Sequence, residues 1–338
     1  MCKLPVRPVC PPMVFFRIAC VLVALISSSW SWAGSDTLDL RLPRLAAEDV
    51  ASRAATNEFL ISQHTRHPAS EADARRTWLR TTAITAGSAL AIGLYGMNNW
   101  WQDGFTGRFR TIDEGWFGEN TYSGGADKLG HVFMNYVSTR LMARAFEWAG
   151  NESDRALQLG AWFTLGTFAA VEVVDGYSKQ WRFSREDAVM NVVGTGIALL
   201  LEKYPALDDA LDLRLLYWPS RDGTRDYDPV GDYSGQTYLA VLKASGVPGL
   251  RTYPLLRYVE FAAGYGTRGY SATLPGVAGR RARNLYIGIS LNLSELLGQT
   301  VFKHSSTQNP VRRATDTLLE FIQVPGTAGL ARYRLSAD

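Results

Sequence analysis

The chain has 338 residues, and its 35 Lys and Arg against 32 Asp and Glu give a formal net charge of +3. This length is enough for two domains of ordinary size. The charge excess is small and does not gather into a basic patch, so we expect no nucleic-acid partner.

Residues 1–33 have the pattern of a secretory signal peptide. The apolar run 18–26 follows a basic start, and Ser31 and Ala33 are the small residues expected before a cleavage site. Three basic residues and no acidic residue precede this site, so Lys and Arg fall from 35 to 32 in the mature chain, equal to Asp and Glu. We therefore expect an exported, periplasmic protein of nearly zero net charge.

All three cysteines precede the expected cleavage site, at Cys2, Cys10 and Cys20. The mature chain would then have neither a thiol nucleophile nor a Cys-ligated zinc site. Cys20 lies inside the apolar run and not after it, which is unfavourable for lipid attachment.

A polar N-terminal segment, residues 34–76, precedes a helical bundle predicted over residues 77–204. The first of four expected helices covers about 77–101 and has no charge from Thr81 to Gln102, which is long enough to span a bilayer. Arginines before this helix favour a cytoplasmic start, whereas cleavage of the signal would place that end outside. A compact, membrane-leaning bundle therefore fits better than independent spans, and an integral inner-membrane protein is the alternative.

The second helix would carry Arg140, Arg144 and Glu147 on its outer stripe. Residues 205–338 change to period-two alternation, which predicts a small antiparallel β-rich domain. The expected strands are 238–243, 259–265, 285–293, 317–324 and 330–335, with a turn at Gly276 and Gly279. The resulting fold class is α+β, a four-helix bundle followed by a β-rich C-terminal domain.

Three pairs of polar residues interrupt the apolar helices at helical spacing. They are Asp127 with His131, Glu172 with Asp175, and Asp187 with Asn191. Each pair lies on one helix face. Because buried charges are costly without partners, we expect the three pairs to meet at one place.

Each pair also has a structural explanation. Ser184 is placed to cap a helix with Asp187 at the third position, and Asp127 follows two glycines and could cap its own helix. The carboxylates of the second pair need a cation, for which Lys128, Lys179 or Arg182 is available. The Gly-rich loop 113–127 lacks a phosphate-loop signature and is better explained as a tight turn.

Two chemical uses of the cluster are possible besides a structural ion-pair network. His131 could hold a divalent metal with Glu172, Asp175 or Asp187. Alternatively, His131 could act as an acid or base while Lys128 holds an anionic group. The candidate catalytic residues are His131, Asp127, Lys128, Glu172, Asp175, Asp187 and Asn191.

We prefer a binding or structural role in the cell envelope, in contact with a membrane surface or envelope proteins and with a small-molecule ligand possible. The competing function is an envelope hydrolase or transferase that acts on lipid or glycan phosphates.

The segments that carry these pairs have a family resemblance. Residues 124–131, 172–176 and 183–194 resemble the YfiM-like family of uncharacterised, predicted periplasmic lipoproteins, and more distantly the VanZ-like membrane proteins. The resemblance covers about residues 100–204 and implies a periplasmic location, but it brings no activity with it.

Overall fold

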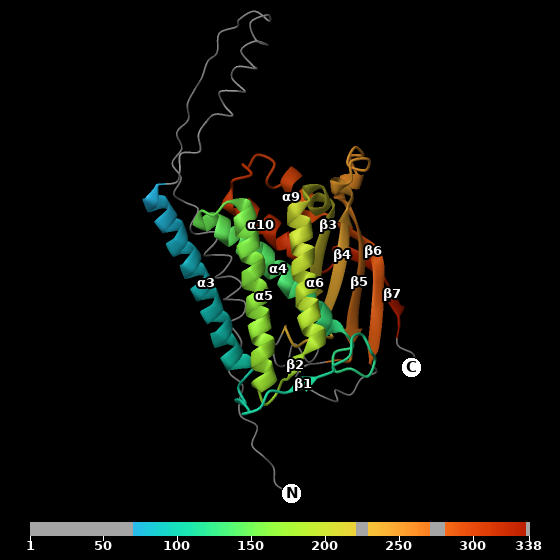
Figure 1. Ribbon diagram of the computed structural model, residues 1–338. Coiled ribbons are helices and arrows are strands. Elements are labelled where there is room, and N and C mark those ends of the chain that lie inside the picture. Colours follow the sequence, from blue (N-terminus) through green and yellow to red (C-terminus); the bar gives the residue numbers. More distant parts are fainter. Residues whose placement is uncertain (1–69, 221–228, 271–280, 336–338) are drawn as a thin grey trace, which may run out of the picture.

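The structure is a computed structural model that describes residues 70–220, 229–270 and 281–335 (Figure 1). The predicted signal peptide 1–33, residues 34–69 of the polar segment and the turn at Gly276 and Gly279 lie outside the described residues. The chain combines helices with one main sheet, which confirms the α+β class.

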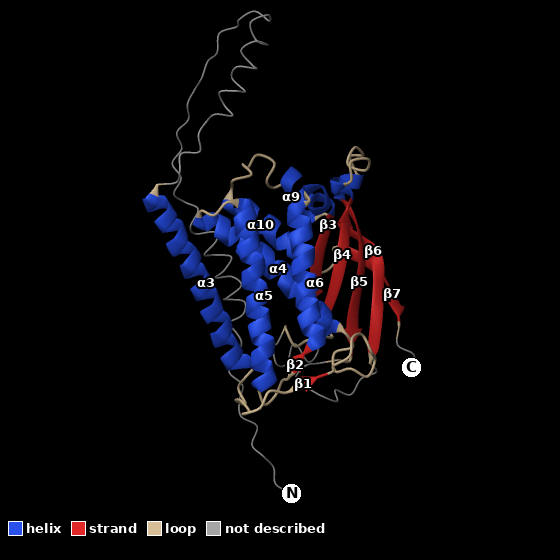
Figure 2. Ribbon diagram, viewed as in Figure 1, coloured by secondary structure: helices blue, strands red, loops and turns tan. Residues whose placement is uncertain are grey.

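Four long helices lie side by side and form the helical part of the protein (Figure 2). They are α3 (Glu71–Asn99), α4 (Ala126–Ala149), α5 (Ser153–Tyr177) and α6 (Arg185–Lys203). The first helix begins earlier than expected, because the side chain of Ser70 accepts a hydrogen bond from the Asp73 amide and caps it.

Two glycines let α4 approach its neighbours closely. A Cβ atom on Gly160 of α5 would lie 2.8 Å from the Thr139 carbonyl oxygen, and one on Gly194 of α6 would lie 2.2 Å from the Val132 carbonyl oxygen. No larger residue fits either position without moving a helix, so these glycines set the spacing that brings the polar pairs together.

The sheet has five strands in the order β3-β4-β5-β6-β7, and every neighbouring pair is antiparallel. The strands are β3 (Leu211–Tyr217), β4 (Gln236–Lys243), β5 (Val259–Arg268), β6 (Ala282–Leu291) and β7 (Ala328–Arg334). A separate two-residue pair, β1 (Thr111–Ile112) and β2 (Phe183–Ser184), is parallel. The predicted antiparallel sheet is therefore confirmed.

Short helices precede β3 and lie between β4 and β5 and between β6 and β7. They are α7 (Pro205–Ala210), α9 (Leu293–Gln299), α10 (Pro310–Phe321) and the 3-10 turns η1 (Ala244–Gly246) and η2 (Leu256–Tyr258).

The prediction of a strand at 317–324 was wrong, because most of this segment belongs to α10. Asn309 caps the helix through its side chain and Pro310 occupies the first turn, and both are helix-start signals upstream of the apparent alternation. The strand β3 was not among the strands expected from the sequence.

The inner face of the sheet carries a buried charge cluster beside an apolar cluster of Leu239, Val241 and Ala262, whereas the outer face is apolar. Asp212, Arg214 and Glu260 are buried on the inner face, where Arg214 contacts both carboxylates at 2.5 and 2.8 Å. A Cβ atom on Gly264 would lie 2.5 Å from the Tyr238 carbonyl oxygen and one on Gly288 2.0 Å from that of Gly329, so glycine at these positions permits close packing on this face.

The outer face of β3 and β4 packs against α4 and α6. Phe133, Tyr136 and Leu201 of the helices share a core cluster with Phe321 of α10, and Leu213 and Tyr238 of the sheet pack against it. The helical part and the sheet are thus held together by one hydrophobic core.

The expected outer position of Arg140 was wrong. Its side chain is 2% exposed and lies 2.7 Å from carboxylate oxygens of both Glu202 and Asp208 and 3.0 Å from Glu320. The arginine joins three elements that are distant in sequence, which its helical position alone does not reveal.

Among the described residues, α5 alone is long and apolar enough to cross a membrane by length and composition. The core helix of a soluble protein can have the same properties. Helix α3, which contains most of the uncharged stretch that was expected to be long enough to span a bilayer, is not among the helices with this length and composition.

Candidate functional site

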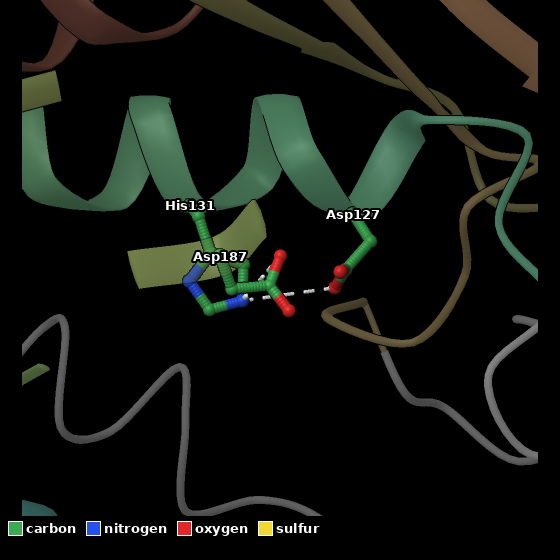
Figure 3. A group of neighbouring side chains, drawn as sticks. All are labelled: Asp127, His131 and Asp187. Atoms are coloured by element: carbon green, nitrogen blue, oxygen red, sulfur yellow. Dashed lines mark ion pairs between the residues drawn. The ribbon is translucent and has the colours of Figure 1, made fainter. Parts of the chain in front are cut away.

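Members of all three polar pairs meet around His131, whereas Asp175 lies at the edge of the group. The Nε2 atom of His131 lies 3.8 Å from Asp127 Oδ1 and 3.8 Å from Asp187 Oδ1 (Figure 3). The Nδ1 atom lies 3.8 Å from Glu172 Oε1 and 2.9 Å from Asn191 Oδ1. Residues of α4, α5 and α6 therefore converge on one imidazole ring.

Lys128 neutralises part of the same cluster. Its side chain is 1% exposed, and its Nζ atom lies 2.5 Å from Glu114, 2.6 Å from Asp187 and 3.1 Å from Asp127. The sequence analysis considered Lys128 as a partner for Glu172 or Asp175, but the structure pairs it with three other carboxylates.

Local structure positions two of the carboxylates. Gly125, with φ 92°, is the N-cap of α4 and allows the turn that starts the helix, so Asp127 lies in its first turn, where a negative charge is favourable. Ser184 caps α6 and accepts a hydrogen bond from the Asp187 amide at 3.3 Å, as the sequence predicted. The carboxylate of Asp127 does not cap its helix but accepts a hydrogen bond from the Tyr233 hydroxyl at 3.0 Å.

Asn191 fixes the orientation of the histidine. Its Oδ1 atom accepts a hydrogen bond from Asn135 Nδ2 at 2.6 Å and lies 2.9 Å from His131 Nδ1, which donates to it when this nitrogen carries the proton. In the neutral imidazole the other nitrogen, Nε2, then keeps its lone pair, and this nitrogen faces Asp127 and Asp187.

The cluster shifts the pKa of its members in opposite directions. Burial opposes the charged imidazole, but Asp187, Asp127 and Glu172 outweigh it and raise the pKa of His131 to about 9. Burial likewise opposes ionisation of Asp127, yet His131 and Lys128 lower the pKa of Asp127 to about 2. These two cations therefore keep Asp127 ionised although it is buried.

The other carboxylates are harder to ionise. Burial raises the pKa of Glu114 and of Glu172 to about 7 and that of Asp187 to about 6. The site therefore holds more acidic groups than its two cations can neutralise.

Asp175 belongs to the edge of this region. It accepts a hydrogen bond from the Trp101 indole at 2.6 Å, and burial raises the pKa of Asp175 to about 6. Trp101 lies just after α3, so this bond ties the end of that helix to α5.

Three of the residues could hold a metal ion together. One ligand atom from each of Asp127, His131 and Asp187 lies within 4.8 Å of the other two. Glu172 faces the nitrogen that Asn191 already engages. The sequence analysis grouped the metal candidates differently, with Glu172 and Asp175 and without Asp127.

Sequence reasoning missed Glu114, Tyr233 and Asn135. Glu114 lies in the glycine-rich loop before α4. An acidic residue shortly before a lysine that was expected in an apolar helix was the signal in the sequence that could have identified it. Tyr233 comes from the segment before β4, more than a hundred positions from Asp127, and only the tertiary structure brings the two together.

Residues 113–203 match the model of a family described as "Predicted periplasmic lipoprotein (DUF2279)". The match covers about a quarter of the chain and includes every residue of the cluster on α4, α5 and α6, as well as Glu114. It supports an exported, periplasmic protein of an uncharacterised type. The resemblance to YfiM-like and VanZ-like proteins stays a prediction. Comparisons with curated proteins and with solved structures gave no match.

Proposed function

We propose that this exported envelope protein binds one divalent cation at Asp127, His131 and Asp187. The observation that carries the proposal is the approach of three ligand atoms of different residues to within 4.8 Å. Two carboxylate oxygens and one imidazole nitrogen form a donor set suited to zinc or manganese.

Two of the three distances between ligand atoms need little adjustment. Ligands about 2.1 Å from zinc at a tetrahedral angle are about 3.4 Å apart. Each carboxylate oxygen lies 3.8 Å from His131 Nε2, so closing by about 0.4 Å gives this spacing. The hydrogen bond from His131 Nδ1 to Asn191 is the outer contact that orients a metal-binding imidazole.

The charge balance supports a cation as well. Glu114, Asp127, Glu172 and Asp187 surround one lysine and one histidine, and burial makes the remaining negative charge costly. A divalent ion would lower this cost. The side chain of His131 is 21% exposed, which leaves a route from solvent to the site.

The role we propose is cation binding that fixes the packing of α4 on α6. Asp127 and His131 lie on α4 and Asp187 lies on α6, so one ion would link the two helices. Because part of the His131 side chain is accessible to solvent, the same purified protein can also be assayed for the alternative function, hydrolysis.

The test is a cation titration of the purified full chain after chelator treatment. We expect one equivalent of zinc or manganese to bind and to raise Tm, because an ion at about 100 times its Kd adds about 2.7 kcal/mol of stability. Asp127→Asn and His131→Gln should abolish the effect. Asp175→Asn, a nearby carboxylate outside the three ligands, is the matched control and should bind as the original chain does.

Binding that survives both ligand variants, or no binding at all, would refute the proposal. Turnover of phosphoesters by the zinc-loaded chain, lost in His131→Gln, would favour the hydrolase over a binding role.

A further inference from the structure

An apolar pocket of about 600 Å³ lies between α4 and the outer face of the sheet. On α4 it is lined by Leu129, Val132 and Phe133, and its lining includes none of Asp127, His131 and Asp187. The pocket is therefore separate from the proposed cation site. Its volume is within the range of about 300–1,000 Å³ typical of small-molecule sites.

The lining offers hydrocarbon and few polar groups. The hydroxyl of Tyr238 donates to Gln236 at 2.8 Å, and that of Tyr265 donates to the Gly124 carbonyl oxygen. Arg214 is the charged residue of the lining, and its guanidinium is bonded to Asp212 and Glu260 on the inner face. A ligand with many hydrogen-bonding groups would thus lose its hydrogen bonds to water on entering the pocket and gain few in return.

The apolar surface continues beyond the pocket along β6. Leu285, Ile287 and Ile289 are 44%, 69% and 56% exposed on the outer face, and Tyr333 on β7 is 70% exposed. A contiguous exposed apolar surface of this kind marks a binding site in a stable protein.

The sheet itself argues against a peptide strand as the occupant. β5 pairs with β6 along its whole length, and β6 pairs with β7 from Asn284 to Ser290. Their backbone groups already bond one another, so a strand laid in the pocket would leave its own N–H and C=O groups unpaired. A hydrocarbon chain has no such groups.

Positive charge gathers at one end of the apolar row. Arg283 lies two residues before Leu285 and therefore on the same face of β6. Its guanidinium donates to the Phe117 carbonyl oxygen, which holds it at this end of the strand. Arg281, two residues earlier, stacks on Tyr270, whereas Arg332 and Arg334 face the inner side because they pair with Tyr286 and Asn284. Guanidinium groups bind phosphate oxygens well.

We propose that the pocket and the adjoining face bind one phospholipid from the envelope membrane, with an acyl chain between α4 and the sheet and the phosphate at Arg283. The apolar lining and the charge at the end of β6 match the two parts of such a molecule.

The test uses the purified full chain and monomeric phosphatidylglycerol with a fluorescent acyl chain. We expect one lipid to bind. Ala263→Phe, which fills the pocket with apolar atoms, and Ile287→Glu should each weaken binding about tenfold or more. Val311→Glu, at a residue 63% exposed on α10, is the matched control and should bind normally. Circular dichroism and Tm show whether each variant is folded.

The role of Arg283 is tested with phosphatidylcholine. Arg283→Gln should reduce the preference for the anionic lipid and leave binding of phosphatidylcholine unchanged. An unchanged preference would overturn the assignment of the phosphate.

Normal lipid binding by folded Ala263→Phe would overturn the assignment of the pocket as the acyl-chain site, as would absence of lipid binding by the original chain. A lipid-free dimer that Ile287→Glu converts to a monomer would identify a second copy as the occupant and would also overturn the proposal.

Discussion

Replacing Lys128 with methionine removes the buried cation that three carboxylates share. The Nζ atom lies 2.5, 2.6 and 3.1 Å from Glu114, Asp187 and Asp127, and the side chain is 1% exposed. Methionine keeps most of the volume, so the loss is mainly electrostatic. Removing one partner of a buried ion pair costs about 3–5 kcal/mol, and we expect a loss in this range at pH 7.5.

The loss should depend on pH in a defined direction. The folded-state pKa values of Glu114 and Asp187, about 7 and 6, lie above their usual values, so protonation at low pH stabilises the folded chain. Without Lys128 these pKa values rise further. The deficit of Lys128→Met should therefore shrink between pH 7.5 and pH 5, by up to about 1.4 kcal/mol per pH unit for each carboxyl that gains a proton.

Urea unfolding followed by tryptophan fluorescence measures this difference at both pH values. Lys203→Met, at an exposed position near the end of α6, is the control and should change stability by less than about 0.5 kcal/mol. A deficit below about 1 kcal/mol at pH 7.5, or one equal at both pH values, would show that Lys128 does not neutralise the cluster.

Three further predictions concern the helices and the site. Gly194→Ala should destabilise the chain by about 1–3 kcal/mol or more, because its Cβ would lie 2.2 Å from the Val132 carbonyl oxygen. Gly196→Ala, whose Cβ would have no atom within 4 Å, should stabilise the chain by up to about 1 kcal/mol, and thermal unfolding measures both effects. Zinc affinity should rise about tenfold per pH unit between pH 7 and 8.5, because the pKa of His131 is about 9 and zinc binding displaces its proton. Calorimetry in two buffers should find about one proton released per zinc ion. Release of no proton would contradict the assignment of His131 as a ligand. Because the pKa of Asp175 is raised, its contribution to stability is greatest at low pH and is lost as pH rises through about 6. Asp175→Asn should remove roughly 1–3 kcal/mol of this pH-dependent loss and keep the hydrogen bond from Trp101. A pH–stability curve equal to that of the original chain would contradict the raised pKa.

The sequence alone predicted where the helices lie and which residues share a face. Periodicity placed α4, α5 and α6 and the strands β4, β5, β6 and β7, because burial on one side leaves a repeat of 3.6 or 2 in the chain. It also gave the capping role of Ser184, since a cap depends on residues within one turn.

Only the tertiary structure decided which charges meet. The partners of Lys128 come from a loop, from its own helix and from α6, and their choice depends on how closely α4 and α6 pack at Gly194. The same holds for Arg140 and for the pocket between α4 and the sheet, because no local pattern records which surface a helix face will contact.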